Sequence, residues 1–121
     1  MDVLSSKADW TVALELANAD GSAMNLSGLD IDVAFGIEAR TRRYVTTVRS
    51  GAGVTFENAA TGVIVASVKR AVHAATFVPN APNNVVADVF ILTGRGTLGE
   101  TRDYIGRAVF ALVEGVEQWP L

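Results

Sequence analysis

Several residue types are missing or scarce in this 121-residue chain, and their scarcity excludes whole classes of function. The chain has no cysteine, which excludes disulfide scaffolds, thiolate zinc sites, iron–sulfur clusters and cysteine nucleophiles. His73 is the only histidine, and no serine lies in a G-x-S-x-G motif, so a serine hydrolase triad lacks its usual components. We therefore predict a non-enzymatic protein with no catalytic residues, no cofactor and no metal.

Charge and long apolar runs are also limited. Only 19% of the residues are charged, and the net charge is −3, which argues against general binding to polyanions. No stretch approaches 18 uncharged apolar residues, and the first seven residues lack the basic and apolar regions of a signal peptide. We expect a soluble protein with no membrane partner and no nucleic-acid partner.

Apolar and polar residues alternate along much of the chain, which is typical of β-strands. The alternation runs over residues 10–16 and, most cleanly, over residues 29–38. Residues 69–77 have helical propensity but allow only a turn or two before two prolines. Further runs rich in β-branched or apolar residues lie at 43–49, 54–56, 63–68, 85–93 and 104–113.

These patterns predict an all-β fold with at most one short helix near residues 69–77. About seven or eight short strands favour an antiparallel β-sandwich, with a small barrel as the alternative. We expect an N-terminal arm (1–8), a single sandwich domain (9–116) and a C-terminal tail (117–121).

The charges are unevenly distributed along the chain. Residues 1–39 contain seven acidic residues and one basic residue, whereas residues 40–70 contain six basic residues and one acidic residue. Such segregation allows a basic face of one molecule to complement an acidic face of its neighbour.

Two features of the sequence match patterns found at binding or catalytic sites, but the residues around them do not favour such a site. Residues 94–99 match G-x-G-x-x-G, but the chain continues as a strand where a dinucleotide site needs a helix to begin, so we predict a hairpin loop. His73 lies beside basic residues in the short helical segment, and we expect it to be exposed to solvent or next to a helix cap.

Asp30 and Asp32 share one face of a predicted strand. With a third carboxylate such as Asp20 or Glu38 nearby, they would suit Ca²⁺ binding or acid–base chemistry. The twelve-residue calcium-loop pattern is absent, so we favour a solvated strand face.

The densest basic cluster is Arg40-Thr41-Arg42-Arg43-Tyr44, in a predicted turn. Arginines beside an aromatic ring suit contacts with phosphates and bases. Because the chain is acidic and has no second segment of this kind, we favour a solvated turn or a protein–protein contact.

A series of turn and strand motifs occurs in order between residues 9 and 116. The series resembles the small β-sandwich domains of tailed-phage virion proteins, including domains similar to the N-terminal domain of upper baseplate proteins. Its members are Asp20-Gly21-Ser22-Ala23-Met24-Asn25-Leu26-Ser27-Gly28, Gly53-Val54-Thr55-Phe56, Gly62-Val63-Ile64-Val65, Gly106-Arg107-Ala108-Val109-Phe110 and Val113-Glu114-Gly115-Val116.

The resemblance implies an immunoglobulin-like sandwich that is a structural part of the virion, for example in the tail, baseplate or fibre attachment. Such a protein is assembled in the host cytoplasm as several symmetric copies, contacts other virion proteins and has no catalytic residues. We expect intersubunit contacts at both termini and at the basic cluster. Trp10 is expected in the core, whereas Trp119 follows the last strand and suits an interface. The predicted interface residues are Arg40, Arg42, Arg43, Tyr44 and Trp119.

Two other classes of function remain as alternatives. A carbohydrate-binding or adhesion module would need a row of exposed aromatic rings, and a glycan signal lost on mutation of Tyr44 would identify it. An enzyme is the least favoured class, and a bound metal or turnover would identify it.

Overall fold

A mixed β-sheet of eight strands contains most of the chain in the computed structural model, which describes residues 3–78 and 81–113. In these ranges the helical elements are α1 (Arg70–His73) and a single 3₁₀ turn, η1 (Ala59–Thr61). No helix in the same ranges has the length and apolar character needed to cross a membrane. An all-β fold with a short helix within residues 69–77 is therefore confirmed. The strands are β1 (Val3–Ser5), β2 (Trp10–Glu15), β3 (Asp30–Glu38), β4 (Arg42–Ser50), β5 (Gly53–Asn58), β6 (Val63–Val68), β7 (Asn83–Thr93) and β8 (Thr101–Val113).

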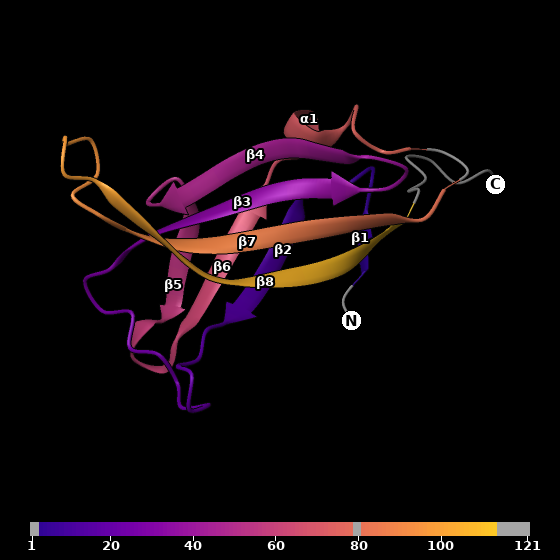
Figure 1. Cartoon of the computed structure of the whole chain (residues 1–121). Helices are drawn as coiled ribbons and strands as arrows, with labels where there is room; N and C mark the ends of the chain where they lie inside the picture. Colours follow the sequence, from indigo (N-terminus) through magenta and orange to yellow (C-terminus); the bar gives the residue numbers. More distant parts are fainter. Residues whose placement is uncertain (1–2, 79–80, 114–121) are drawn as a thin grey trace.

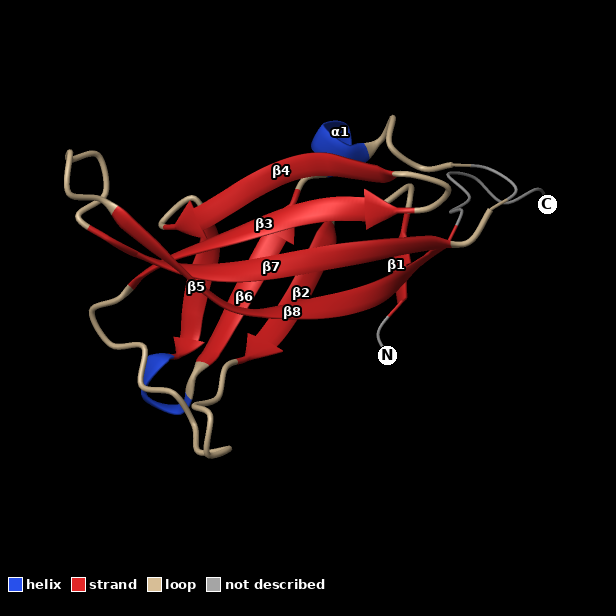
Figure 2. Ribbon diagram, viewed as in Figure 1, coloured by secondary structure: helices blue, strands red, loops and turns tan. Residues whose placement is uncertain are grey.

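The sheet bends into two layers that cross steeply. Its strand order is β1-β8-β7-β3-β4-β5-β6-β2. In Figures 1 and 2, β8, β7, β3 and β4 run side by side across the front, and β5, β6 and β2 pass behind them. We call these two groups the front layer and the back layer. The sheet is consequently nearly barrel-shaped.

The corner between the layers lies where β4 passes into β5. Arg49 of β4 pairs in parallel with Gly53 of β5, although only three residues separate them in the chain. Gly53 has a φ of +104°, and a Cβ atom placed on it would lie 2.7 Å from the Cβ of Val48. The chain turns this sharply because residue 53 is a glycine.

Two strand pairs are parallel, β4 with β5 and β1 with β8, so the prediction of a purely antiparallel sheet is wrong at both. Residues 3–5, expected to lie in an N-terminal arm, form β1 and pair with residues 111–113 of β8. β1 and β2 are the two ends of the strand order, and no pairing within the described residues joins β2 to β8. The boundary expected at residue 116 and the tail 117–121 lie outside the described residues.

The core lies between the two layers and follows the alternation of the sequence. Trp10 is fully buried, as predicted, and its ring centroid lies 6.2 Å from that of Phe35 on the facing layer. Because successive residues of a strand point to opposite sides, each strand contributes one apolar row to this core. Its members include Val12, Leu14, Ile31, Val33, Ile37, Ile64, Val68, Val85, Val89, Phe110 and Leu112.

His73 is buried, so the expectation of solvent exposure is wrong, whereas the alternative that it lies next to a helix cap is confirmed, because His73 is the last residue of α1. Its imidazole stacks on the indole of Trp10, with centroids 3.9 Å apart and planes 10° apart. Its Nε2 atom lies 2.7 Å from the carbonyl oxygen of Ala8. The backbone N–H of Arg70 donates to the carboxylate of Asp9 at 2.7 Å, which holds α1 next to the start of β2. This contact between distant segments places the ring in the core.

Candidate functional site

The outward face of the front layer carries small side chains at its centre. Across the strands, Tyr44 of β4 lies in register with Gly36 of β3, and Gly36 lies in register with Val86 of β7. On the neighbouring row, Ala34 pairs with Asp88. Because Gly36 and Ala34 have little or no side chain, space is left between the larger groups on either side.

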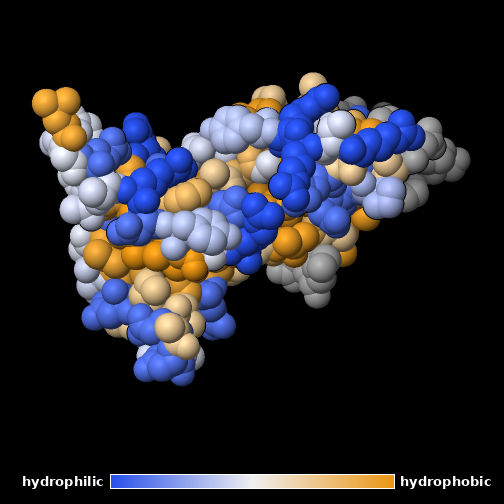
Figure 3. Space-filling view, viewed as in Figure 1, coloured by the Kyte–Doolittle hydropathy of each residue, from blue (hydrophilic) through white to orange (hydrophobic). Residues whose placement is uncertain are grey.

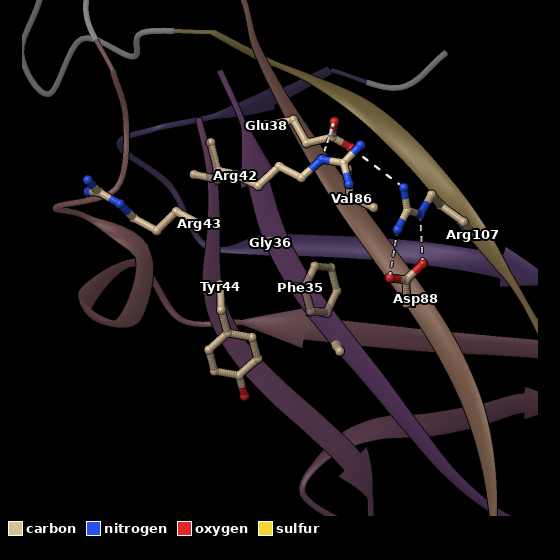
Figure 4. A pocket seen from close by; sticks show the side chains of 11 residues that line it. Phe35, Gly36, Glu38, Arg42, Arg43, Tyr44, Val86, Asp88 and Arg107 are labelled. Atoms are coloured by element: carbon tan, nitrogen blue, oxygen red, sulfur yellow. Dashed lines mark hydrogen bonds and ion pairs between the residues drawn. The ribbon is translucent and has the colours of Figure 1, made fainter. Parts of the chain in front are cut away.

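This space is a groove of about 210 Å³. Val86 is buried at its base, so the floor is apolar although the face is exposed to solvent. Figure 4 shows the ring of Tyr44 on one side of the groove and a chain of ion pairs on the other, and Figure 3 shows hydrophilic and hydrophobic residues side by side on this face. We call it the Tyr44 groove. Its floor is Ala34, Gly36 and Val86, and its rim is Glu38, Arg42, Tyr44, Asp88 and Arg107.

A β-bulge determines where Tyr44 points. Phe35 pairs with Thr46 but Gly36 pairs with Tyr44, so Val45 is an extra residue of β4 at this point. One extra residue reverses the side on which the following residues of a strand emerge. Tyr44 consequently lies on the outward face, where it is 68% exposed and its hydroxyl forms a hydrogen bond with Thr47 Oγ1 at 2.8 Å.

The charged rim is a connected set of ion pairs. Arg107 makes a bidentate contact with Asp88, from Nε at 2.8 Å and from Nη2 at 3.1 Å. Its Nη1 lies 3.6 Å from Glu38, whose other carboxylate oxygen lies 3.5 Å from Nε of Arg42. The hydrogen bonds to Asp88 raise the pKa of Arg107 above its usual value. The two arginines are exposed and Asp88 is half-buried, so the pairs contribute modestly to stability and mainly fix the orientation of the charges.

A second ion-pair cluster holds the loop between β7 and β8 against β3. Nε and Nη2 of Arg95 each donate to the carboxylate of Asp30 at 2.6 Å, and Nη2 also donates to Asp32. The hydrogen bond from Arg95 lowers the pKa of Asp30. The prediction of a solvated face for Asp30 and Asp32 is therefore wrong, because a loop arginine folds over them. Among residues 3–78 and 81–113, no group of three or more His, Asp or Glu side chains is placed to hold a metal ion.

The G-x-G-x-x-G segment is a hairpin loop, as predicted, and joins β7 to β8. Gly94 and Gly96 have φ values of +69° and +79°, which favour glycine. Thr97 donates from its backbone N–H and its hydroxyl to the carbonyl oxygen of Gly94, at 3.0 and 2.6 Å. The hairpin projects from the sheet (Figure 1), and Leu98 within it is fully exposed.

No protein-family model matches this chain, and no curated protein sequence matches it. The interpretation of the site therefore relies on its own geometry and on the sequence motifs.

The structure brings three of the five predicted interface residues to one groove. Arg42 and Tyr44 both line the Tyr44 groove. Arg43 also borders the groove, but Figure 4 shows its guanidinium turned away from the ion pairs of the rim. Arg40 lies between β3 and β4, as expected for a turn, whereas Arg42 already opens β4. Trp119 lies outside the described residues.

Most residues of the groove were not predicted from the sequence. Ala34 and Gly36 interrupt the polar side of the alternation in residues 29–38, and two small residues at alternate positions of a strand signal a depression on its solvent face. Asp88 and Arg107 gave no such signal, because their pairing depends on the register of β7 with β8.

Proposed function

We propose that this chain is a non-enzymatic structural protein of a phage virion, in the tail, baseplate or fibre attachment. It acts through protein–protein contacts, in several symmetric copies and with other virion proteins, after assembly in the host cytoplasm. We also propose that the fold is of the immunoglobulin-like sandwich type, with the front and back layers as its two sheets. The motif resemblance over residues 9–116 supports both proposals.

The composition of the Tyr44 groove is the observation that best supports a role in protein–protein contacts. An exposed tyrosine and two arginines, Arg42 and Arg107, surround a floor that includes a buried valine. Tyrosine and arginine are enriched at the centres of protein interfaces, where they bury a large area. The paired charges on the rim supply orientation and specificity.

A comparison of variants by sedimentation velocity tests this role. Tyr44→Ala and Trp119→Ala are expected to shift the protein towards single chains at a concentration where the wild type is associated. Val72→Ala is the matched control, because Val72 is an exposed apolar residue on α1 that does not line the groove. Circular dichroism verifies that each variant is folded. If Tyr44→Ala associated as strongly as the control, the result would contradict a role for the groove in protein–protein contacts.

A carbohydrate-binding or adhesion role is the second candidate. Tyr44 and Tyr104 are 68% and 56% exposed, and the front-layer register places both on the outward face. The hydroxyl of Tyr104 donates to Asp88 at 3.4 Å, which holds its ring close to the groove. A glycan array with the wild type, Tyr44→Ala and Tyr104→Ala tests this role. A signal lost in both variants supports sugar binding, and a blank array opposes it.

A further inference from the structure

The β7–β8 hairpin presents one leucine to solvent on a projecting loop. Leu98 is fully exposed, and its neighbours Thr97 and Gly99 are exposed as well. Figure 3 shows apolar atoms at the end of the projection that Figure 1 identifies as this hairpin. A single exposed leucine is unremarkable on a flat surface. On a projecting tip it can enter a depression on another molecule.

Hydrogen bonds and an ion-pair anchor constrain the loop that carries Leu98. Backbone and hydroxyl hydrogen bonds from Thr97 close the turn at Gly94, and the N–H of Glu100 donates to the carbonyl oxygen of Thr97 at 3.2 Å. Arg95 anchors the base of the loop to β3 through Asp30 and Asp32. A loop that is already ordered loses less conformational entropy when it binds, so its contacts contribute more to affinity.

The same chain carries a depression that fits such a tip. The Tyr44 groove, of about 210 Å³, has an apolar floor and exceeds the volume of about 150 Å³ that accommodates a benzene ring in a protein cavity. The tip cannot reach the groove of its own chain. Gly94 lies eight positions after Val86 along β7 and its turn, which is about 26 Å of extended strand.

Charges beside the two features are complementary. Glu100 lies two residues after Leu98, is exposed, and has no ion pair within the described part of the chain. Arg43 borders the groove and is likewise exposed without an ion pair among residues 3–78 and 81–113. When Leu98 of one copy lies in the groove of another, an attraction between Glu100 and Arg43 favours the docked orientation.

We propose that the Leu98 hairpin of one copy docks into the Tyr44 groove of the next copy. This inference rests on the proposed function, because it names the partner of the groove as a second copy of this chain. The contact joins two different surfaces, so it is head-to-tail, and repeating it produces a ring or a filament rather than a closed dimer.

Two complementary variants test the contact. Leu98→Ser removes the apolar tip and leaves the groove intact, whereas Ala34→Gln fills the groove with a polar side chain and leaves the tip intact. Each variant alone is expected to weaken self-association by about tenfold to a hundredfold, the effect of losing one buried leucine. Because each variant keeps one intact surface, a 1:1 mixture is expected to form heterodimers and nothing larger. Val72→Ser is the control and should associate like the wild type.

A charge exchange provides a second arm of the experiment. Glu100→Arg and Arg43→Glu should each weaken association, and the double variant should restore most of it. Because Leu98, Glu100 and Arg43 are all exposed, their replacement should leave the unfolding midpoint unchanged.

The outcomes separate this inference from the function on which it rests. A wild type that associates while Leu98→Ser associates equally well overturns the hairpin contact and leaves an assembly role standing. Two monomeric variants that form no heterodimer when mixed overturn the head-to-tail arrangement. A wild type that stays a single chain at every concentration overturns both the contact and self-assembly.

Discussion

Replacing Arg95 with glutamine is expected to lower the free energy of unfolding by about 1–2 kcal/mol. Hydrogen bonds to charged groups contribute about 1.5–3 kcal/mol, and exposure reduces this contribution. The Arg95 and Asp30 side chains are 28% and 34% exposed, which favours the lower part of the range. Asp32 is only 11% exposed, so its carboxylate would be left beside that of Asp30 without the cation that contacts both.

Urea unfolding of Arg95→Gln, Asp32→Asn and the double variant measures this effect as a double-mutant cycle. We expect a coupling of about 0.5–1.5 kcal/mol between the two side chains. Arg43→Gln is the matched control, since Arg43 is exposed and has no ion pair among the described residues. If Arg95→Gln lowered the free energy of unfolding no more than this control does, a stabilising role for the Arg95 ion pairs would be refuted.

The pH dependence of stability follows from the same contacts. Arg95 lowers the pKa of Asp30 below the ordinary value of 3.8, so the contribution of this pair is present above that pH. It is lost as the pH falls through the lower folded-state pKa. The wild type should therefore lose more stability than Arg95→Gln between about pH 4 and pH 2. If the stabilities of the wild type and of Arg95→Gln fell equally over this pH range, the result would contradict a stabilising contact between Arg95 and Asp30.

Three further predictions test other parts of the structure by thermal or urea unfolding. His73→Ala removes the stack on Trp10 and should destabilise the protein by about 2–3 kcal/mol, whereas an effect near zero would contradict its burial. Gly53→Ala should destabilise by about 1–3 kcal/mol because its φ is positive and the added Cβ meets Val48, and a neutral result would contradict the sharp corner. Arg107→Gln should destabilise by at most about 1 kcal/mol, since Arg107 is 43% exposed, and a larger loss would contradict this view of the rim.

The approximate positions of β2 to β8 were predictable from local runs of alternating or β-branched residues, whereas β1 was not predicted. Residues 63–68 form β6 as expected, and residues 29–38 differ from β3 by one residue. The parallel pairs and the steep bend of the sheet were not predictable in this way. The parallel pairs depend on which strands become neighbours in the sheet. The bend depends on the sharp turn at Gly53, which the local sequence pattern does not reveal.

The candidate site likewise combines residues that a local motif indicated with contacts that depend on strand pairing. The basic cluster pointed to Arg42 and Tyr44, and both line the groove. The bulge at Val45, which turns Tyr44 outward, follows from the pairing of β3 with β4 rather than from the composition of either strand. Similarly, Arg95 covers Asp30, from which it is separated by 65 positions in the chain, and no local pattern predicts such a contact.

The most direct test of the central claim is the mass of the wild-type chain in solution, measured by light scattering over a series of concentrations. An assembly protein that contacts its own copies should show a mass that rises with concentration towards a multiple of the single chain, and Leu98→Ser should shift this rise to higher concentration. A mass equal to that of one chain at every concentration would contradict self-assembly through the front layer.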